Sequence, residues 1–436
     1  MVTSQRLAEI TGGVAYGEAA LTGISTDSRS LDPGSLFVAL RGETFDGHDY
    51  LAAALEAGAA AILVDTPAPF EPRIEVEDTL LALRAIAADY RSSLTTARAV
   101  GITGSTGKTS CKDLLASALG VGTWASPRSF NNEVGVPLTV LSAPMDTEIL
   151  VLEVGSRGVG HISNLIEVVR PDIAVITGIG ASHLATLGDV ETVRHAKWEL
   201  VEGLNAGGMA ILPAEDRTLA EWAERDGVAV QSFGEGGDVR VEGLALDEMA
   251  RPSFVLEAGG ERVGLKLSMA GAHQARNAAA AAAAGLALGR ALPDLAAGLE
   301  LAHGSAWRME VTPGPFTVVN DAYNANPDSM AAALQSVAAM PGRHVAVLGL
   351  MAELGEAAPA AHRSVGRLAR QLGYAAVVVV GEDPGIAEGA GDIVRAVSDA
   401  RAARLLITEL VDEGDVVLVK ASRSVGLEGL AGELVS

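Results

Sequence analysis

The chain has 436 residues, enough for about three domains, and 49% of them are hydrophobic, so it can build sizeable cores. Its net charge of −23 argues against nonspecific binding to nucleic acid or to an anionic membrane. No uncharged apolar run approaches the ~18 residues of a membrane span. The single cysteine, Cys111, cannot form an internal disulfide, and the first residues lack the apolar core of a signal peptide, so we expect a cytoplasmic protein.

Residues 1–93 are predicted to form a small α/β domain. A strand is expected at 35–40, a helix at 50–58 and a buried strand at 60–64. Polar residues stand on both sides of the first strand: Ser25, Thr26 and Ser28 precede it, and Arg41 and Thr44 follow it together with Phe45. This cluster could bind a ligand, but ordinary capped loops have the same composition.

The most informative stretch is an apolar run, a glycine-rich turn and a helix start that follow one another. In the turn, Thr103-Gly104-Ser105-Thr106-Gly107, glycines allow backbone N–H groups to curl around a phosphate, and Lys108-Thr109-Ser110 opens the helix. In such a loop Lys108 reaches the β- and γ-phosphates and Thr109 holds Mg²⁺. The usual spacing is not kept, because Ile102 stands where a glycine is expected. The alternative is therefore a generic glycine-rich turn between a strand and a helix.

Residues 94–308 are predicted to form a parallel sheet that carries this loop, because continuous apolar runs recur at 149–154 and 173–177. Ligands of such sheets bind at the carboxyl ends of the strands. Glu153 closes the first run and His183 follows the second, so both could coordinate Mg²⁺ or its water ligands. For His183 a purely structural hydrogen bond is the alternative.

Lysine is rare in this chain, with five lysines against 27 arginines. A lysine that remains is a candidate for a role that arginine cannot fill. Lys197 lies on a predicted helix, where a solvated side chain is the alternative. Further along, residues 230–268 are predicted to form short strands, and seven consecutive alanines at 278–284 predict a closely packed helix.

Residues 309–436 restart the α/β pattern, with strands expected at 316–319, 344–348, 375–380 and 416–419. The segment Asp321-Ala322-Tyr323-Asn324-Ala325-Asn326-Pro327 follows the first of these strands. Its density of polar side chains is typical of ligand contacts. The segment Lys420-Ala421-Ser422-Arg423 follows the last strand in the same way.

Taken together, these motifs resemble the Mur ligase family over essentially the whole chain. The general family pattern is matched by residues 103–109, Glu153, His183, the Ala196-Lys197-x-Glu199 segment, Asn277 and Arg308. Residues 130–137, 321–327 and 348–355 resemble the branch that adds a dipeptide. Two positions depart from it, since Ala421 stands where glycine is common and Leu350 where aspartate is common.

The resemblance implies an α/β fold of three domains. A central parallel-sheet ATPase domain with the phosphate loop (94–308) would lie between a small N-terminal α/β domain that binds the UDP substrate (1–93) and a Rossmann-like C-terminal domain (309–436). It implies ATP-dependent ligation of D-alanyl-D-alanine to UDP-N-acetylmuramoyl-tripeptide through an acyl phosphate, with ATP and Mg²⁺ as cofactors. Closure of the domains would exclude water. We expect a monomer that has no nucleic-acid partner and does not span a membrane.

The resemblance also implies roles for single residues. Catalysis would rest on Lys108, Glu153, His183 and Lys197, and the metal ligands would be Thr109, Glu153, His183 and Lys197, the last as a carbamate formed with CO₂. The nucleotide would be held by residues 104–110 (Gly104, Ser105, Thr106, Gly107, Lys108, Thr109, Ser110), Asn277, Arg308, Asp321, Asn324 and Asn326. The substrate would be held by Ser25, Thr26, Ser28, Arg41, Thr44, Phe45, Asn131 and Asn132.

Two other classes of protein remain at this point. One is a sister ligase that adds the third peptide residue, or a folylpolyglutamate-synthetase-like ligase, against which the Asn324-Ala325-Asn326-Pro327 segment argues. The other is a nucleotide-switch binding protein, in which Glu153, His183 and Lys197 would be unnecessary.

Overall fold

The computed structural model describes residues 2–42, 44–180 and 187–435, and its residues group into two compact units. Unit 1 comprises Met1–Gly101, Gly122–Gly155 and His161–Asp172, and unit 2 comprises Ile102–Val121, Ser156–Gly160 and Ile173–Ser436. His183 lies outside the described residues. Among the described residues, no helix is both long and apolar enough to cross a membrane.

The N-terminal part of unit 1 is a five-stranded sheet in the order β2-β7-β6-β5-β4. Its strands are β2 (Val14–Tyr16), β4 (Gly23–Ser25), β5 (Ser35–Val38), β6 (Ala61–Val64) and β7 (Arg73–Glu75), parallel except for β2. A two-stranded ribbon adds β1 (Val2–Thr3) and β3 (Ala20–Leu21), and the helices of this unit are α1 (Ser4–Thr11), α2 (Leu51–Glu56), α3 (Thr79–Ser93), α5 (Gly135–Leu141) and α6 (Ile166–Val169). The helix expected at 50–58 is shorter than predicted, because a 3₁₀ turn capped by Asp46 occupies Gly47–Tyr50.

A nine-stranded sheet has the order β16-β15-β14-β13-β12-β11-β8-β10-β9. Its strands are β8 (Arg98–Thr103), β9 (Thr123–Ala125), β10 (Ile149–Glu153), β11 (Ile173–Ile176), β12 (Met209–Pro213), β13 (Ala229–Phe233), β14 (Val239–Leu246), β15 (Pro252–Ala258) and β16 (Glu261–Lys266). The apolar runs predicted as buried strands become β10 and β11, whose residues are all buried. The β-rich stretch predicted at 230–268 is confirmed as β13 to β16, and β14, β15 and β16 pair antiparallel.

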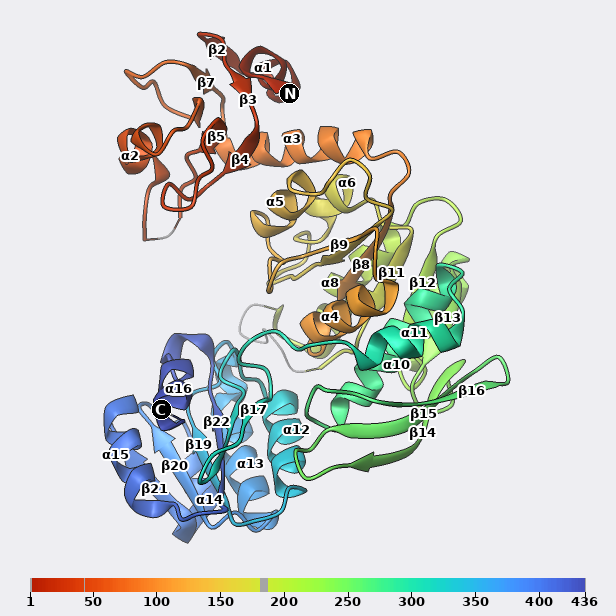
Figure 1. The fold of residues 1–436 in the computed structure, drawn as a ribbon, viewed down its shortest axis with the longest axis vertical. Coiled ribbons are helices and arrows are strands. Elements are labelled where there is room, and N and C mark those ends of the chain that lie inside the picture. The colour runs from red at the N-terminus through yellow and green to blue at the C-terminus, as the bar shows by residue number, and fades with distance from the viewer. Residues whose placement is uncertain (1, 43, 181–186, 436) are drawn as a thin grey trace. The chain divides into compact units, whose positions relative to one another are not determined.

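Unit 2 adds helices to this sheet, namely α4 (Lys108–Leu119), α8 (Val190–Glu202), α9 (Arg217–Asp226), α10 (His273–Ala287) and α11 (Leu292–Glu300). The predicted alanine helix is confirmed as α10, and all seven alanines are buried. It packs against α4, which begins directly at the phosphate loop (Figure 1). Methyl side chains allow the two helices to approach closely, so the seven alanines explain how α10 comes to lie beside the loop.

The C-terminal part of unit 2 is a six-stranded sheet in the order β17-β18-β22-β19-β20-β21. Its strands are β17 (Glu310–Thr312), β18 (Thr317–Asn320), β19 (His344–Leu348), β20 (Ala376–Val380), β21 (Val394–Val397) and β22 (Val416–Lys420), and its helices are α12 (Pro327–Ala338), α13 (Ala358–Gln371), α14 (Ile386–Ala390), α15 (Ala400–Leu410) and α16 (Glu428–Leu434). The edge strands β17 and β21 are not predicted from the sequence, because both are short and half-exposed and carry no continuous apolar run.

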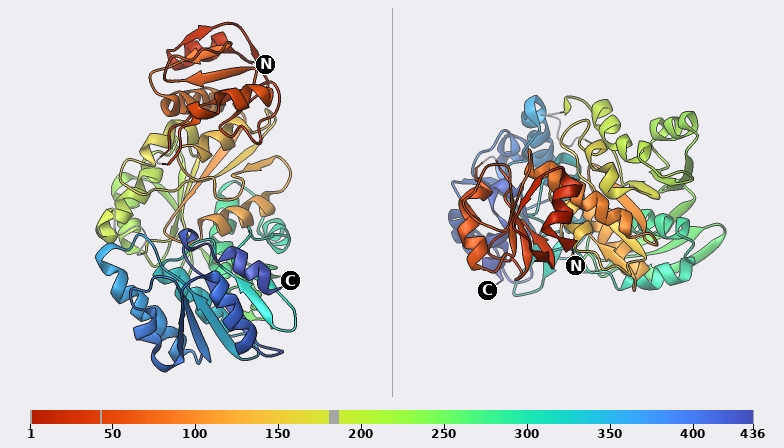
Figure 2. Two further views of the ribbon diagram at one scale, coloured as in Figure 1. Left: turned by 90° about the vertical axis from the view of Figure 1, so that its left-hand side faces the viewer. Right: turned by 90° about the horizontal axis from the view of Figure 1, so that it is seen from above.

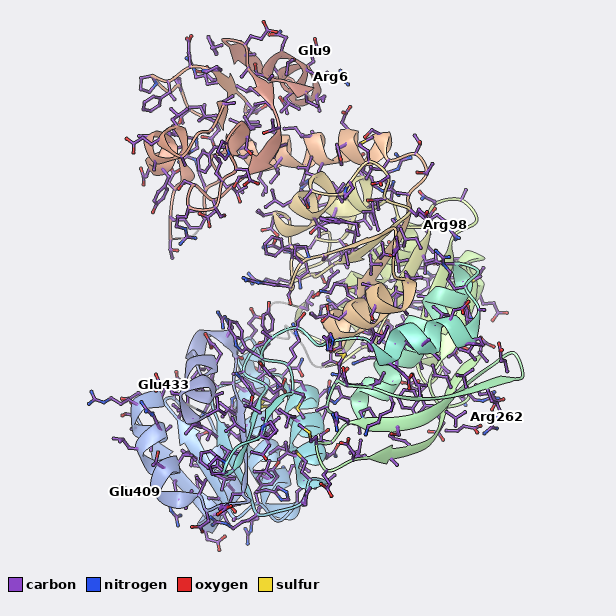
Figure 3. The ribbon with its side chains drawn as sticks, in the orientation of Figure 1. Arg6, Glu9, Arg98, Arg262, Glu409 and Glu433 are labelled. Atoms are coloured by element: carbon purple, nitrogen blue, oxygen red, sulfur yellow. The ribbon has the colours of Figure 1, made fainter. Side chains whose placement is uncertain are left out.

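Helices cover both faces of this sheet, as Figures 1 and 2 show. Successive strand residues alternate between two cores: Val377 and Val379 pack with α12, α13 and α14, whereas Val378 and Val380 pack with α15 and α16. Figure 3 shows the outer surface of α15 and α16, where Glu409 and Glu433 are labelled. The sheet is therefore doubly wound, and its strand ends supply the loops of the candidate site.

Candidate functional site

The phosphate loop joins β8 to α4 through backbone conformations that favour glycine. Gly104 has φ of 145° and Gly107 has φ of 81°. A Cβ at Gly107 would lie 2.4 Å from Oδ1 of Asn277, so both the backbone angle and the space require glycine there. The α4 helix starts at Lys108, and its first N–H groups face the loop. The Nζ atom of Lys108 donates to the carbonyl of Gly104 at 2.5 Å, so the lysine folds back over the turn.

A second loop, after β11, holds the phosphate loop in place. Ser105 and Gly180 bond reciprocally: the Ser105 hydroxyl donates to the Gly180 carbonyl at 3.1 Å and accepts the Gly180 N–H at 3.0 Å. The Thr177 hydroxyl donates to the carbonyls of Thr103 and Thr106. These bonds preorganise the backbone N–H groups of the turn, as anion binding requires.

The face of α10 that looks toward this turn carries two amide side chains. Asn277 donates to Oε1 of Gln274 at 2.9 Å, and Gln274 donates to the Ser110 hydroxyl at 3.4 Å. Gln274 is buried and orients Asn277 beside Gly107. Gln274 is not among the residues predicted from the sequence, although its spacing of three residues from Asn277 puts both on one helical face.

Lys197 is buried on α8, with 1% of its surface exposed. Its Nζ atom donates to the Ser156 hydroxyl at 2.8 Å. Burial, aided by the positive charge of Lys108, lowers the pKa of Lys197 to about 7, whereas Glu199 acts in the opposite direction. A substantial fraction of the amine is thus neutral near neutral pH. The alternative of a solvated lysine is wrong.

Glu153, at the end of β10 in unit 1, is buried and ordered by two neighbours. Its Oε1 atom accepts from the Asn131 amide at 2.7 Å, and its N–H donates to the Ser126 hydroxyl at 3.1 Å. The adjacent Asn132 has a different task, because its Oδ1 atom accepts the N–H groups of Val134 and Gly135 before α5. The structure therefore brings Asn131, and not the side chain of Asn132, to Glu153.

In the C-terminal sheet, a buried ammonium joins the loops after β18 and β22. Lys420 is 2% exposed, and its Nζ atom lies 2.6 Å from Oδ2 of Asp321 and 2.8 Å from the Asn324 carbonyl. The other carboxylate oxygen of Asp321 accepts the Met309 N–H at 3.0 Å. The Asn326 side chain caps α12 by accepting the Ser329 N–H. The side chains of Asp321 and Asn326 are thus engaged within the protein.

Arg308 precedes this sheet and belongs to the same neighbourhood. Its guanidinium lies over the Tyr323 ring, 4.1 Å from the ring centroid. Such a stack fixes the plane of the guanidinium while its N–H groups point sideways. The loop that contains Tyr323 also contains Asn324, so Arg308 packs against the loop that carries the predicted Asn324.

The predicted substrate residues of the N-terminal part lie at the carboxyl ends of β4 and β5. Ser25, Thr26 and Ser28 are half-buried, whereas Thr44 and Phe45 are exposed. The Arg41 guanidinium pairs with both Asp65, at 2.8 Å, and Asp46. Its charge is therefore already balanced by carboxylates, which argues against Arg41 as an isolated anion clamp.

No group of three or more His, Cys, Asp or Glu side chains that could hold a metal by itself occurs within residues 2–42, 44–180 and 187–435. Mg²⁺ in nucleotide sites commonly takes one or two protein ligands and completes its shell with phosphates and water. The hydroxyl of Thr109, on α4, and the carboxylate of Glu153, at the end of β10, are each an oxygen donor of the kind that Mg²⁺ takes. Cys111 is buried on α4, and burial raises the pKa of its thiol to about 12, so it is a packing residue.

Comparisons with known proteins point to the same family along the whole chain. Models of the Mur ligase family match residues 20–103 (catalytic domain), 102–285 (middle domain) and 307–423 (glutamate ligase domain). The UDP-N-acetylmuramoyl-tripeptide–D-alanyl-D-alanine ligase of Mycobacterium tuberculosis is 38% identical, over 100% of this chain and 98% of its own. A crystal structure of MurF from Acinetobacter baumannii has a TM-score of 0.91 at 32% identity, covering 99% of this chain and 98% of that one. The MurF ligase from Thermotoga maritima in complex with ADP has a TM-score of 0.84 at 29% identity, covering 95% of this chain and 96% of that one.

Proposed function

The chain belongs to the Mur ligase family, and we propose that it joins D-alanyl-D-alanine to UDP-N-acetylmuramoyl-tripeptide while cleaving ATP to ADP and phosphate. The observation that carries this proposal is the full-length similarity to a ligase of that name, together with a phosphate loop whose glycines have the required conformations. The structural likeness to a relative in complex with ADP supports use of the same nucleotide.

The reaction requires two anions to meet. A carboxylate oxygen of the tripeptide attacks the γ-phosphorus, the bond to the β-phosphate oxygen breaks, and ADP leaves. The amine of D-alanyl-D-alanine then attacks the acyl carbon, loses a proton, and phosphate leaves. Lys108 and the N–H groups at the start of α4 are placed to stabilise the phosphate charge in both steps.

Mg²⁺ fits the donors that the chain offers, and we assign it to Thr109, Glu153 and His183. When bound, it neutralises charge on the phosphates. The chain's own contribution is to hold these donors in place. Asn131 and Ser126 form hydrogen bonds with Glu153. The hydrogen bonds of Ser105 and Thr177 hold the turn that precedes Thr109.

We assign Lys197 to a further anionic ligand, formed when its neutral amine adds to CO₂ and releases a proton. The lowered pKa and the buried position beside Ser156 support this assignment, because only the neutral amine reacts and burial protects the product. Arginine, which stays protonated, could not replace lysine here.

We base the remaining proposals, for the nucleotide and the UDP substrate, on where the predicted residues lie along the chain. Asn277, Arg308 and Asn324 contact the nucleotide, and Asp321 and Asn326 shape the loop around it. Ser25, Thr26, Ser28, Thr44 and Phe45, from residues 1–93, hold the UDP end of the substrate. Residues 94–308 carry ATP and residues 309–436 complete the ligase site. We propose that the chain works as a monomer. Sedimentation at the protein concentrations used in the activity assay tests this.

The decisive experiment offers the enzyme ATP, UDP-muramoyl tripeptide, UDP-muramoyl dipeptide, D-alanyl-D-alanine, lysine and diaminopimelate together, and then repeats the assay with each of these left out in turn. We expect phosphate release only when the tripeptide and D-alanyl-D-alanine are both present, with a product whose mass equals tripeptide plus dipeptide less water. Addition of a single diamino acid would assign the chain to the sister ligase. Nucleotide hydrolysis without any ligated product would indicate a switch protein.

A further inference from the structure

The loop after β9 holds an arginine in a left-handed backbone conformation. Arg128 has φ of 51°, and the residue is exposed. Glycine adopts this conformation without cost, whereas a residue with a Cβ is strained there. Packing does not explain the arginine, because its side chain is not part of a core. Strain of this kind is concentrated at ligand-binding sites, where the side chain offsets it by what it binds.

Arg128 is held between two residues that both bind Glu153. On one side, the Ser126 hydroxyl accepts the Glu153 N–H at 3.1 Å. On the other side, the Asn131 amide donates to Oε1 of Glu153 at 2.7 Å, and the Asn131 carbonyl accepts the Gly155 N–H, also at 2.7 Å. The segment 126–131 is therefore tied at both of its ends to the end of β10, and Arg128 lies on a fixed support beside Glu153.

The backbone between these two ties forms a tight turn. The Phe130 N–H donates to the Pro127 carbonyl at 3.2 Å, which places Arg128 at the second position of the turn. Strands β9 and β10 run parallel, so the turn and Glu153 both follow at the carboxyl edge of the sheet. Ligands of such sheets bind at that edge. The strained arginine is thus located where a ligand is expected.

The charge of this segment favours an anion. Arg128 is the one charged residue within 126–132. Its guanidinium offers N–H groups in a planar fork that matches the two oxygens of a carboxylate. Because the whole chain has a net charge of −23, an anionic ligand needs a local cation of this kind. Position and charge together fit a carboxylate that lies close to Glu153.

The proposed reaction supplies such a carboxylate. The third residue of the peptide reacts through its main-chain carboxylate, at the phosphate and the Mg²⁺ that we assign to Glu153. Its side chain branches from the carbon that bears this carboxylate, so it also lies near Glu153. Lysine ends in an ammonium group, whereas diaminopimelate ends in an ammonium group and a second carboxylate. A guanidinium attracts the second carboxylate and repels a lone ammonium group.

We propose that Arg128 binds the second carboxylate of a diaminopimelate in the third position of the peptide, and that it makes the enzyme select this tripeptide over the one that ends in lysine. The inference rests on the proposed function, because the reacting carboxylate is what brings the side chain to Glu153. Arg128 acts on the choice of substrate and leaves the steps at the phosphate unchanged.

The test compares two substrates that differ only in the third residue of the peptide. UDP-muramoyl tripeptides that end in diaminopimelate and in lysine are each ligated to D-alanyl-D-alanine with saturating ATP, and kcat/KM is measured for both. Calorimetry without ATP measures the binding of each tripeptide independently of ligation. We expect the unmodified enzyme to prefer the diaminopimelate substrate by at least about 10-fold in kcat/KM.

Arg128→Asn removes the guanidinium and keeps a residue that tolerates the left-handed conformation. It should lower kcat/KM for the diaminopimelate substrate by at least about 10-fold, and change that for the lysine substrate and the KM for ATP by less than about threefold. Arg128→Gly should show the same loss of preference without a fall in melting temperature, because glycine fits the backbone. A folding defect would then not explain the loss.

Arg170 provides the matched control. It is also exposed and left-handed, with φ of 44°, and its guanidinium donates to the Ser92 hydroxyl at 3.0 Å. Arg170 precedes β11, whereas Arg128 follows β9 at the carboxyl edge. Arg170→Asn therefore removes the same charge from the same backbone conformation at a different place, and it should leave the preference between the two tripeptides unchanged.

Three results would overturn the inference. They are no preference for the diaminopimelate substrate in the unmodified enzyme, an unchanged preference in Arg128→Asn, and an equal loss with both tripeptides, which would place the guanidinium on an anion that they share, such as the pyrophosphate. Ligation of both tripeptides without preference would leave the proposed function standing. If neither is ligated, the proposed function fails, and the calorimetric preference and its loss in Arg128→Asn still decide whether Arg128 recognises the second carboxylate.

Discussion

The Nζ atom of Lys197 lies 2.8 Å from the hydroxyl oxygen of Ser156, and the lysine is 1% exposed. A buried lysine beside the positive charge of Lys108 is costly as a cation, and its pKa falls to about 7. Lys266 differs from Lys197 in both respects, because its side chain is 50% exposed and pairs with the carboxylate of Asp247. Lys266 therefore provides the matched control for the predictions on buried lysines.

We expect Lys197→Ala to lose at least about 100-fold in turnover, because the proposed anion at this position is lost. Acetate or propionate should restore part of the activity by occupying its place, and Lys266→Ala should behave like the unmodified enzyme. Phosphate-release assays with and without added carboxylate measure both effects. Near-normal activity of Lys197→Ala would contradict the assignment.

The stability of the protein should depend on pH through Lys197. Its pKa is about 7 in the folded state, against 10.5 for a lysine surrounded by water, so between these values the unfolded chain binds more protons and stability rises with pH. Lys197→Met removes the cost of burying the cation. In CO₂-free buffer it should be more stable than the unmodified protein at pH 6, by on the order of 5 kcal/mol, with the difference shrinking toward pH 10.

Urea unfolding at several pH values measures this difference in the free energy of unfolding. Lys266→Met should show no comparable change between pH 7 and 10. A Lys197→Met variant whose advantage stays constant across that range would show that the lysine is protonated inside the folded protein.

Gly107 and Gly227 both have left-handed angles, with φ of 81° and 66°, but only Gly107 has a close neighbour in the direction of a Cβ. Gly107→Ala should weaken ATP binding by about 100-fold, because the methyl group would displace Asn277 and the turn. Gly227→Ala should cost about 1 kcal/mol of stability and leave ATP binding intact. Calorimetric titration with Mg-ATP compares them, and equal losses of affinity would point to backbone strain alone.

The pair formed by Lys420 and Asp321 should be strongly coupled. Lys420→Met leaves a largely buried carboxylate without its partner and should destabilise the protein by about 3 kcal/mol, whereas Asp321→Asn/Lys420→Met should recover part of that loss. Unfolding of the single and double variants measures the coupling, with Lys266→Met as control. Additive effects would mean that the 2.6 Å contact contributes little.

The sequence alone determined those features that depend on one short segment of the chain. The phosphate loop was predictable, since glycines at 104 and 107 and the Lys108 helix start are local requirements of one turn. The buried strands β10, β19 and β20 were predictable as well, because strands buried on both faces need continuous apolar runs.

Only the tertiary structure decided which polar side chains meet. Asn131 and Asn132 are neighbours of the same type, yet one reaches Glu153 and the other caps the chain before α5. Asp113 accepts hydrogen bonds from Ser305, which is 192 residues away. Such pairings depend on how helices and strand ends pack, which in turn depends on side-chain volumes throughout the cores, and no local pattern records them.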